Sequence, residues 1–158
     1  MTDQGTLIQD GDTATIEFSR RLDASPERVW AALTEPDELA SWLTEGGTFE
    51  ASLGGSVSMD FGDGGVVTGE VMAWDPPALL SYTWVFLDGA ASQLTFVLSA
   101  DGDGTLLLLT HERVPTQTAM GYTLGWHAFL DRFDAYLAGG AVPTWDERIE
   151  AIGPLYQG

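Results

Sequence analysis

The feature that most constrains the fold is a run of six short extended segments between Gly46 and Val114, separated only by brief turn signals. The turns read LGG, GDGG, WDPP, LDGA and DGDG, and such residues favour chain reversal. Parallel neighbours need crossover connections of a dozen or more residues, whereas antiparallel neighbours need only short loops. The sequence therefore predicts an antiparallel meander whose strands lie near TFEASL, SVSMDF, VVTGEVMAW, LLSYTWVF, SQLTFVLSA and TLLLLTHERV.

Segments with other patterns flank this run. Before it, TATIEFSRRL alternates as a half-buried strand does, and DASPERVWAALTEPDELASWL has the apolar spacing of two short helices. Ser25 is expected to cap the first of these helices, and Pro36 to separate it from the second. After the run, apolar residues recur at helical spacing from Trp126 to Leu137, which predicts one long helix over residues 116–140.

This order of elements predicts an α+β helix-grip fold. In that fold a curved antiparallel β-sheet wraps around the long C-terminal α-helix, and two short helices follow the first strand. A chain of 158 residues is about one domain long. We expect a flexible N-terminal segment over residues 1–12, the helix-grip domain over residues 13–140, and a C-terminal tail over residues 141–158 that forms a short helix packed on the domain.

One strand of the predicted sheet carries many large rings. Because successive side chains of a strand alternate between faces, one face of LLSYTWVF holds Leu80, Tyr82, Trp84 and Phe86. Burying one aromatic side chain removes roughly 150–250 Å² from water, so this face must be covered. The long helix can cover it as an ordinary packed core, or helix and strand can form the walls of a pocket that a ligand completes.

Charge and composition narrow the classes of partner. The chain has 24 acidic residues against six arginines and no lysine, which gives a formal net charge of −18. Such a field repels phosphate backbones and anionic lipid heads, so neither nucleic acid nor a membrane is an expected partner. The chain has no cysteine, and no apolar run approaches the ~18 residues that span a bilayer. We therefore expect a cytoplasmic protein without disulfides or thiolate metal sites.

Four segments together resemble successive signatures of one superfamily. They are DASPERVWAALTEPDELASWL, GEVMAWDPPALLSYTW, GTLLLLTHE and GWHAFLDRF. In this order they resemble the SRPBCC (START-like) superfamily, and specifically the bacterial single-domain homologues of the activator of heat-shock protein 90 ATPase. The resemblance covers about residues 13–138. It implies a START-like, Bet v 1-like helix-grip fold with a cavity between the long helix and the sheet, which across the superfamily holds lipids, polyketides, hormones and other apolar molecules.

The resemblance leaves three classes of function open. The first is binding of a small hydrophobic or amphipathic ligand in the cavity. The second is a co-chaperone-like or regulatory interaction module, although the eukaryotic activator uses an additional N-terminal domain that the residues before Thr13 are expected to be too few to supply. The third is an aromatase/cyclase- or isomerase-like enzyme, since polyketide aromatase/cyclases share the superfamily. No cofactor is expected, and a symmetric homodimer is the commonest assembly for such a chain.

The ring-rich strand and the long helix supply most candidate ligand-binding residues. Large rings would form the walls, and Tyr82, His111 and Arg20 would make polar contacts at the mouth. The full candidate set is Met59, Tyr82, Trp84, Phe86, Phe96, His111, Met120, Trp126, Phe129 and Arg20.

His111 and Tyr82 are the candidate catalytic residues. His111 shares strand parity with Leu107 and Leu109, so it is expected to point inward. There it could be a core residue with a hydrogen-bond partner, contact a ligand, or act as an acid or base.

Two further positions have polar residues where chemistry is conceivable. Arg20 falls on the apolar face of its strand, so it would reach the sheet edge, meet a carboxylate such as Asp60 or Glu112, or bind an acidic ligand head. His127 and Asp131 are one helical turn apart, as two metal ligands can be. With only two histidines in the chain, a hydrogen bond on the helix surface is expected there and no metal site.

Overall fold

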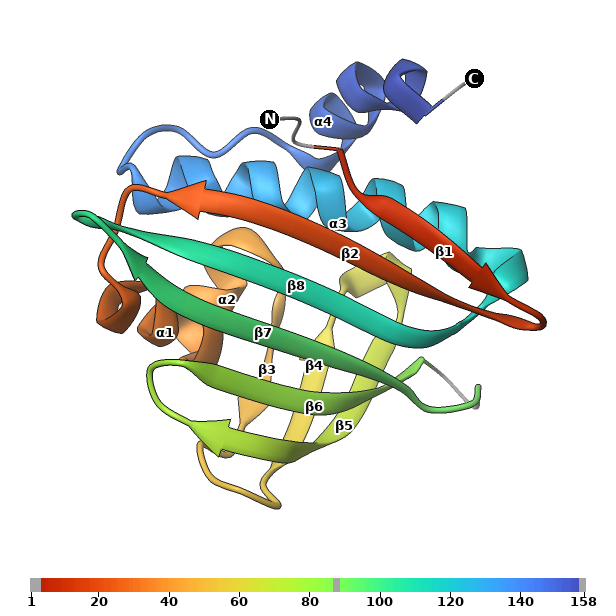
Figure 1. The fold of residues 1–158 in the computed structure, drawn as a ribbon, viewed down its shortest axis with the longest axis horizontal. Coiled ribbons are helices and arrows are strands. Elements are labelled where there is room, and N and C mark those ends of the chain that lie inside the picture. The colour runs from red at the N-terminus through yellow and green to blue at the C-terminus, as the bar shows by residue number, and fades with distance from the viewer. Residues whose placement is uncertain (1–3, 87–88, 157–158) are drawn as a thin grey trace.

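The computed structural model describes residues 4–86 and 89–156, which form one curved sheet and four α-helices (Figure 1). In chain order the elements are β1 (Thr6–Asp10), β2 (Thr13–Leu22), α1 (Pro26–Thr34), α2 (Pro36–Trp42), β3 (Gly46–Phe49), β4 (Ser56–Asp60), the 3-10 turn η1 (Gly62–Gly64), β5 (Val66–Asp75), β6 (Leu79–Phe86), β7 (Ser92–Asp101), β8 (Gly104–Pro115), α3 (Thr116–Leu137), α4 (Trp145–Ile152) and the 3-10 turn η2 (Gly153–Tyr156).

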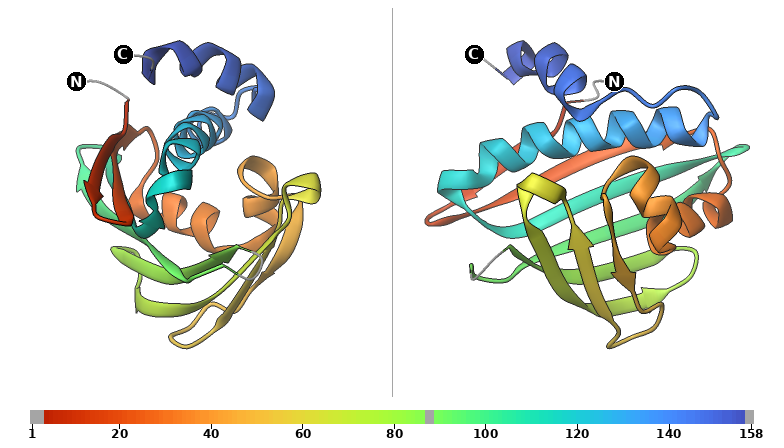
Figure 2. Two further views of the ribbon diagram at one scale, coloured as in Figure 1. Left: turned by 90° about the vertical axis from the view of Figure 1, so that its right-hand side faces the viewer. Right: turned by 180° about the vertical axis from the view of Figure 1, so that it is seen from behind.

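The sheet confirms the predicted antiparallel meander. Its strands lie in the order β1-β2-β8-β7-β6-β5-β4-β3, and every neighbouring pair is antiparallel. The strands from β3 to β8 follow one another directly, and β8 then pairs with β2. The sheet curves around α3, which lies along its concave side (Figure 2). The predicted helix-grip fold is therefore confirmed.

The interior lies between the concave face of the sheet and α3. On β6 the predicted inward face is buried at Leu80, Tyr82 and Trp84. The ring of Trp84 reaches Trp126 of α3, with 5.5 Å between ring centroids. The large rings of the sheet and those of the long helix therefore confront each other, which is the arrangement that the sequence pattern required.

The two short helices close one end of the interior. Ser25 caps α1, accepting a hydrogen bond from the amide of Arg28 at 3.2 Å, and Pro26 occupies the first turn. Pro36 begins α2. Trp42 at the end of α2 stacks on Phe133 of α3, with centroids 4.1 Å apart. This contact ties the short helices to the long one.

Within the N-terminal segment that was expected to be flexible, residues 6–10 form a strand. Thr6–Asp10 forms β1, an edge strand that pairs with β2 across a turn at Gly11, where φ is +65°. Four of its five side chains are exposed and only Leu7 is half-buried, so no alternating apolar pattern marks the strand. Main-chain hydrogen bonds to β2 stabilise it, and the Asp10–Gly11 dipeptide was the hairpin signal in the sequence.

Within the C-terminal tail, residues 145–152 form the short helix α4. Thr144 and Glu147 form a reciprocal capping box at the start of α4, which lies beside α3 on the side away from the sheet (Figure 2). Beyond α4, Tyr156 of η2 accepts a hydrogen bond from the amide of Gly5 at 2.7 Å. Among the described residues, no helix is both long and apolar enough to cross a membrane.

Candidate ligand-binding cleft

A cleft of about 1170 Å³ opens along one side of α3. Its inner wall is the end of β6 with the neighbouring parts of β5 and β7. The turn η1, the end of α2 and the start of α4 complete the rim. The residues that line it and matter below are Glu45, Phe61, Asp63, Trp84, Phe86, Ser92, Thr118, Gly121, Tyr122, Gly125, Trp126, Phe129, Arg132, Trp145 and Asp146.

Aromatic rings form a continuous surface in this cleft. Phe61 lies 6.0 Å from Trp84 and 6.1 Å from Phe129, measured between ring centroids. Phe129 in turn lies 6.5 Å from Trp145, whose surface is 41% exposed. Phe61, Phe86 and Phe129 are only half-buried. The cleft therefore presents ring faces and edges that nothing in the described chain covers.

Four of the residues predicted to bind ligand meet on this cleft, and the others lie elsewhere. Trp84 and Phe86 come from β6, and Trp126 and Phe129 from α3. Three others lie deeper in the core, namely Met59, Tyr82 and Phe96. Met120 lies on α3 but away from the cleft and is 43% exposed.

Tyr82, a candidate catalytic residue, is enclosed by the core. Its ring meets the ring of Phe49 edge-on at 5.6 Å between centroids. Burial raises the pKa of Tyr82 above its ordinary value, so the phenol stays protonated. This position does not favour proton transfer to a molecule in the cleft.

His111 lies behind the aromatic wall rather than on the surface of the cleft. The indole Nε1 of Trp126 donates to His111 Nδ1 at 3.0 Å, and because an indole can only donate, Nδ1 is the unprotonated nitrogen. The hydrogen on Nε2 then points to Ser92 Oγ, 2.7 Å away, which itself donates to the carbonyl of Trp84 at 3.1 Å. Burial lowers the pKa of His111 to about 3. The ring is thus neutral at physiological pH and engaged at both nitrogens, an arrangement that does not favour acid–base chemistry.

Tyr122 is a half-buried residue of α3 that lines the cleft. The indole Nε1 of Trp84 donates to its hydroxyl oxygen at 3.1 Å. Burial raises the pKa of Tyr122, and the hydrogen bond from Trp84 offsets only part of that rise. The hydroxyl is therefore protonated at neutral pH and can donate.

The charged groups around the cleft are mostly acidic. Among the described lining residues they are Glu45, Asp63, Asp146 and Arg132. Arg132 donates from Nε to the carbonyl of Pro143 at 2.9 Å and from Nη1 to that of Trp42 at 2.7 Å. Its guanidinium therefore holds α4 and α2 to α3, and three carboxylates dominate the rim.

Arg20 lies on the other side of α3, beyond reach of the cleft. It is buried, 5% exposed, and its Nη1 lies 2.9 Å from Oδ1 of Asp131. Neither a position at the sheet edge nor a pairing with Asp60 or Glu112 is observed. The predicted strand parity was correct, but the partner comes from α3 because that helix, and no strand, faces β2 at this point.

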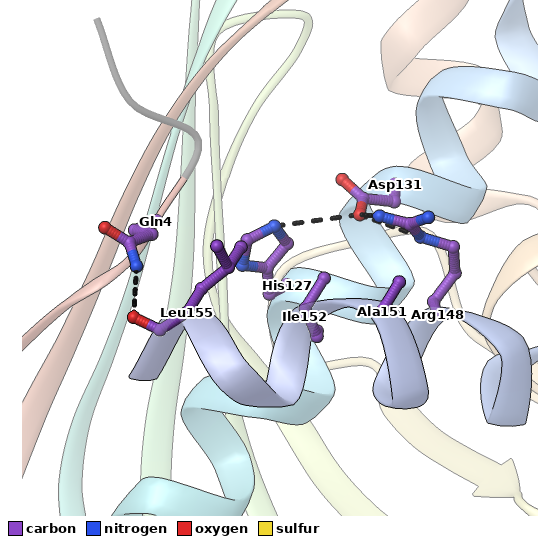
Figure 3. Close-up of a pocket in the computed structure, with 7 residues that line it drawn as sticks. All are labelled: Gln4, His127, Asp131, Arg148, Ala151, Ile152 and Leu155. Atoms are coloured by element: carbon purple, nitrogen blue, oxygen red, sulfur yellow. Dashed lines mark hydrogen bonds and ion pairs between the residues drawn. The ribbon is translucent and has the colours of Figure 1, made fainter. Parts of the chain in front are cut away.

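A second, polar pocket of about 350 Å³ lies near this ion pair, between α3 and α4 (Figure 3). Asp131 Oδ2 accepts from Arg148 Nη2 at 2.6 Å and lies 3.7 Å from Nε2 of His127. His127 Nδ1 lies 2.9 Å from the hydroxyl of Tyr156. His127 is buried here, not on the helix surface as expected. Within the described ranges, no third metal-binding side chain joins His127 and Asp131.

Several lining residues were missed in the sequence. Phe61 shares the parity of Met59 in the predicted strand SVSMDF, and Tyr122 lies one helical turn before Trp126, so the sequence pattern held a signal for both. Gly121 and Gly125, spaced four apart, share the cleft side of α3, and this spacing was a visible signal. Trp145 lines the cleft only because α4 folds back beside α3, and no local sequence pattern predicts that arrangement.

Comparison with known proteins agrees with this architecture. The sequence model of the family described as "Activator of Hsp90 ATPase homolog 1-like protein" matches residues 23–138. The solved structure of CalU16 from Micromonospora echinospora is similar with a TM-score of 0.74 and 27% identity, over 96% of each chain. No curated protein matches the chain.

Two further solved structures are similar over smaller parts of this chain. DynU16, a protein of the dynemicin biosynthetic locus, is similar with a TM-score of 0.75 and 26% identity. The match covers 84% of this chain and 49% of DynU16, so this chain spans about half the length of that protein. The Aha1 dimer from Colwellia psychrerythraea is 22% identical with a TM-score of 0.71, over 78% of this chain and 95% of that one, which is a likeness of fold.

Proposed function

This chain belongs to the family of Activator of Hsp90 ATPase homolog 1-like proteins, and from that premise we propose that it binds a small hydrophobic or amphipathic molecule in the cleft beside α3. The observation that carries the proposal is the aromatic lining. Trp84 and Phe86 of β6 and Phe129 of α3 line a cleft of about 1170 Å³. Ligand sites are typically apolar hollows of roughly 300–1,000 Å³, so this one suits a polycyclic or long-chain molecule.

Two glycines of α3 support the same proposal. Gly121 and Gly125 line the cleft, and a Cβ atom built on either would meet no atom within 4 Å. Glycine inside a helix costs about 1 kcal/mol relative to alanine, and packing within the chain does not require it at these positions. A ligand lying flat against the helix would benefit from the missing side chains. The glycines are then part of the binding surface.

The driving force would be burial of apolar surface. A molecule that covered about 200 Å² of aromatic surface in the cleft would gain roughly 5 kcal/mol at ~25 cal/mol per Å² before ordering costs. That gain suffices for a weak to moderate complex. DynU16 has the same fold and comes from a biosynthetic locus. This similarity is compatible with a small-molecule ligand for the present chain.

The test uses an uncharged fluorescent probe, N-phenyl-1-naphthylamine. The wild-type chain should bind it saturably, with a rise in probe fluorescence and a ligand-dependent rise in Tm. Gly125→Phe and Gly121→Phe fill the cleft and should remove this binding. Met120→Phe adds the same bulk to α3 outside the cleft and should bind as the wild type does. Circular dichroism verifies that each variant folds.

Two results would contradict the proposal. One is an absence of saturable binding by the folded wild type, and the other is equal binding by both glycine variants. Stimulation of an Hsp90-type ATPase that Gly125→Phe leaves unchanged would instead favour the protein-interaction alternative that the family description raises.

A further inference from the structure

Building on the proposed function, we propose that the Tyr122 hydroxyl recognises the ligand by donating a hydrogen bond to a carbonyl oxygen of an uncharged aromatic molecule. The inference concerns the polar chemistry of the site, whereas the proposed function concerns its apolar walls. The two can therefore fail separately.

The direction of one hydrogen bond carries the argument. The indole Nε1 of Trp84 has a hydrogen and no lone pair to offer, so it must donate to Tyr122 Oη, 3.1 Å away. The hydroxyl oxygen is thereby an acceptor, and its own hydrogen has to point elsewhere. Among the described residues, no acceptor lies within hydrogen-bond distance of that hydrogen. Tyr122 lines the cleft, so this hydrogen is available to a ligand that lies there.

Two other hydroxyls in the cleft, those of Ser92 and Thr118, already donate to backbone carbonyls. Ser92 Oγ donates to the carbonyl of Trp84 at 3.1 Å, within the chain of bonds that begins at Trp126 and passes through His111. Thr118 Oγ1 donates to the carbonyl of Pro115 at 3.2 Å. In contrast, the hydrogen bond from Trp84 uses a lone pair of Tyr122 Oη, and the hydroxyl hydrogen of Tyr122 stays available for donation. An apolar ligand without an acceptor would bury this donor unsatisfied, which selects against pure hydrocarbons.

The charge around the cleft selects the kind of acceptor. A carboxylate accepts hydrogen bonds strongly, but it would enter between Glu45, Asp63 and Asp146. The facing cation, Arg132, is bound by the carbonyls of Pro143 and Trp42. An uncharged ketone or quinone avoids the repulsion and still accepts from Tyr122.

The test compares 9-fluorenone with fluorene, which share a planar skeleton and differ in the carbonyl. Binding is followed by quenching of tryptophan fluorescence. Tyr122→Phe should weaken 9-fluorenone binding roughly 3- to 10-fold, the range for one net hydrogen bond, and leave fluorene binding unchanged or stronger. The carbonyl stretching band of bound 9-fluorenone should lie at lower frequency in the wild type than in Tyr122→Phe.

Tyr136→Phe is the matched control. Tyr136 lies on the same helix, and its hydroxyl donates to Glu38 Oε1 at 2.7 Å outside the cleft. This variant should bind both compounds as the wild type does. Tm measurements identify any loss of binding that is caused by unfolding. The carbonyl stretching band is a second readout, because unfolding of the variant would not reproduce its shift.

The outcomes separate the two proposals. If both compounds bind and Tyr122→Phe weakens them equally, the hydroxyl is not the recognition group, although the cleft still binds apolar molecules. An unshifted carbonyl band in the wild type would lead to the same conclusion. If neither compound binds the folded wild type while N-phenyl-1-naphthylamine does, the carbonyl preference is wrong. If none of the three binds, the proposed function itself fails.

Discussion

Trp126 Nε1 lies 3.0 Å from Nδ1 of His111, and this bond holds a neutral histidine inside the wall of the cleft. The sequence marked both residues as inward-facing and left the role of the histidine open. The geometry gives His111 a partner on each nitrogen, one from α3 and one from β7. The pair therefore links the long helix to the sheet at the back of the cleft.

The first prediction concerns stability at low pH. Burial lowers the pKa of His111 to about 3 in the folded chain, against about 6.5 when unfolded. Between these values only the unfolded state binds the proton, so the stabilisation is complete above pH 6.5 and is lost as the pH falls towards 3. From pH 7 to pH 5 the wild type should lose about 2 kcal/mol more free energy of unfolding than His111→Gln. Urea titrations at both pH values measure this, and parallel pH profiles would contradict it.

The second prediction concerns Gly125. Gly125→Ala should raise the free energy of unfolding of the unliganded chain by about 0.5–1 kcal/mol, because alanine favours a helix and its Cβ would meet nothing within 4 Å. Gly139→Ala is the control, since Gly139 has a φ of +78° at the end of α3 and should lose stability instead. Urea denaturation decides the point. A loss of stability in Gly125→Ala would show that the glycine serves packing within the chain.

The third prediction concerns the buried ion pair between Arg20 and Asp131. Asp131→Asn should reduce the free energy of unfolding by roughly 3 kcal/mol, because it removes the carboxylate charge that faces the buried Arg20. Asp23→Asn breaks an exposed pair with Arg21 and should change stability little. Chemical denaturation of the two variants tests the contrast, and equal effects would mean that burial does not matter here.

The fourth prediction concerns ligand charge. At low salt, 9-fluorenone-4-carboxylate should bind roughly 5-fold more weakly than 9-fluorenone. Added salt should reduce this difference in affinity, because it screens the repulsion between the ligand carboxylate and the acidic residues of the rim. Glu45→Gln combined with Asp63→Asn should reduce the difference as well, since these carboxylates line the cleft. Fluorescence titrations at two salt concentrations measure both effects. If 9-fluorenone-4-carboxylate bound more tightly than 9-fluorenone, the prediction would be wrong, and attraction to Arg132 would outweigh repulsion by the rim carboxylates.

The sequence allowed the sheet and long helix to be predicted because both are amphipathic over many residues. The ring-rich face of β6 needed a cover, and the apolar stripe of α3 supplied it. β1 could not be recognised in the same way, since its pairing uses main-chain groups and its side chains are mostly exposed. Because backbone hydrogen bonds place no requirement on the side chains, the residue types of this segment do not indicate a strand.

The candidate site was less predictable than the fold. Trp84, Phe86, Trp126 and Phe129 follow from strand and helix parity, and they do line the cleft. Parity places a side chain inward without giving its depth, so it did not separate these four from the deeper rings of the core. Arg20 shows the same limit, because its partner is set by how α3 lies across β2 and not by strand register.

The measurement that tests the central claim most directly is a two-dimensional 1H–15N NMR titration of the unmodified chain with 9-fluorenone. The account predicts saturable shifts of the Gly121 and Gly125 amides and of the Trp84 indole NH, with the amide of Arg148 across α3 unchanged. Shifts confined to the pocket around Arg148, or none at saturating compound, would contradict it.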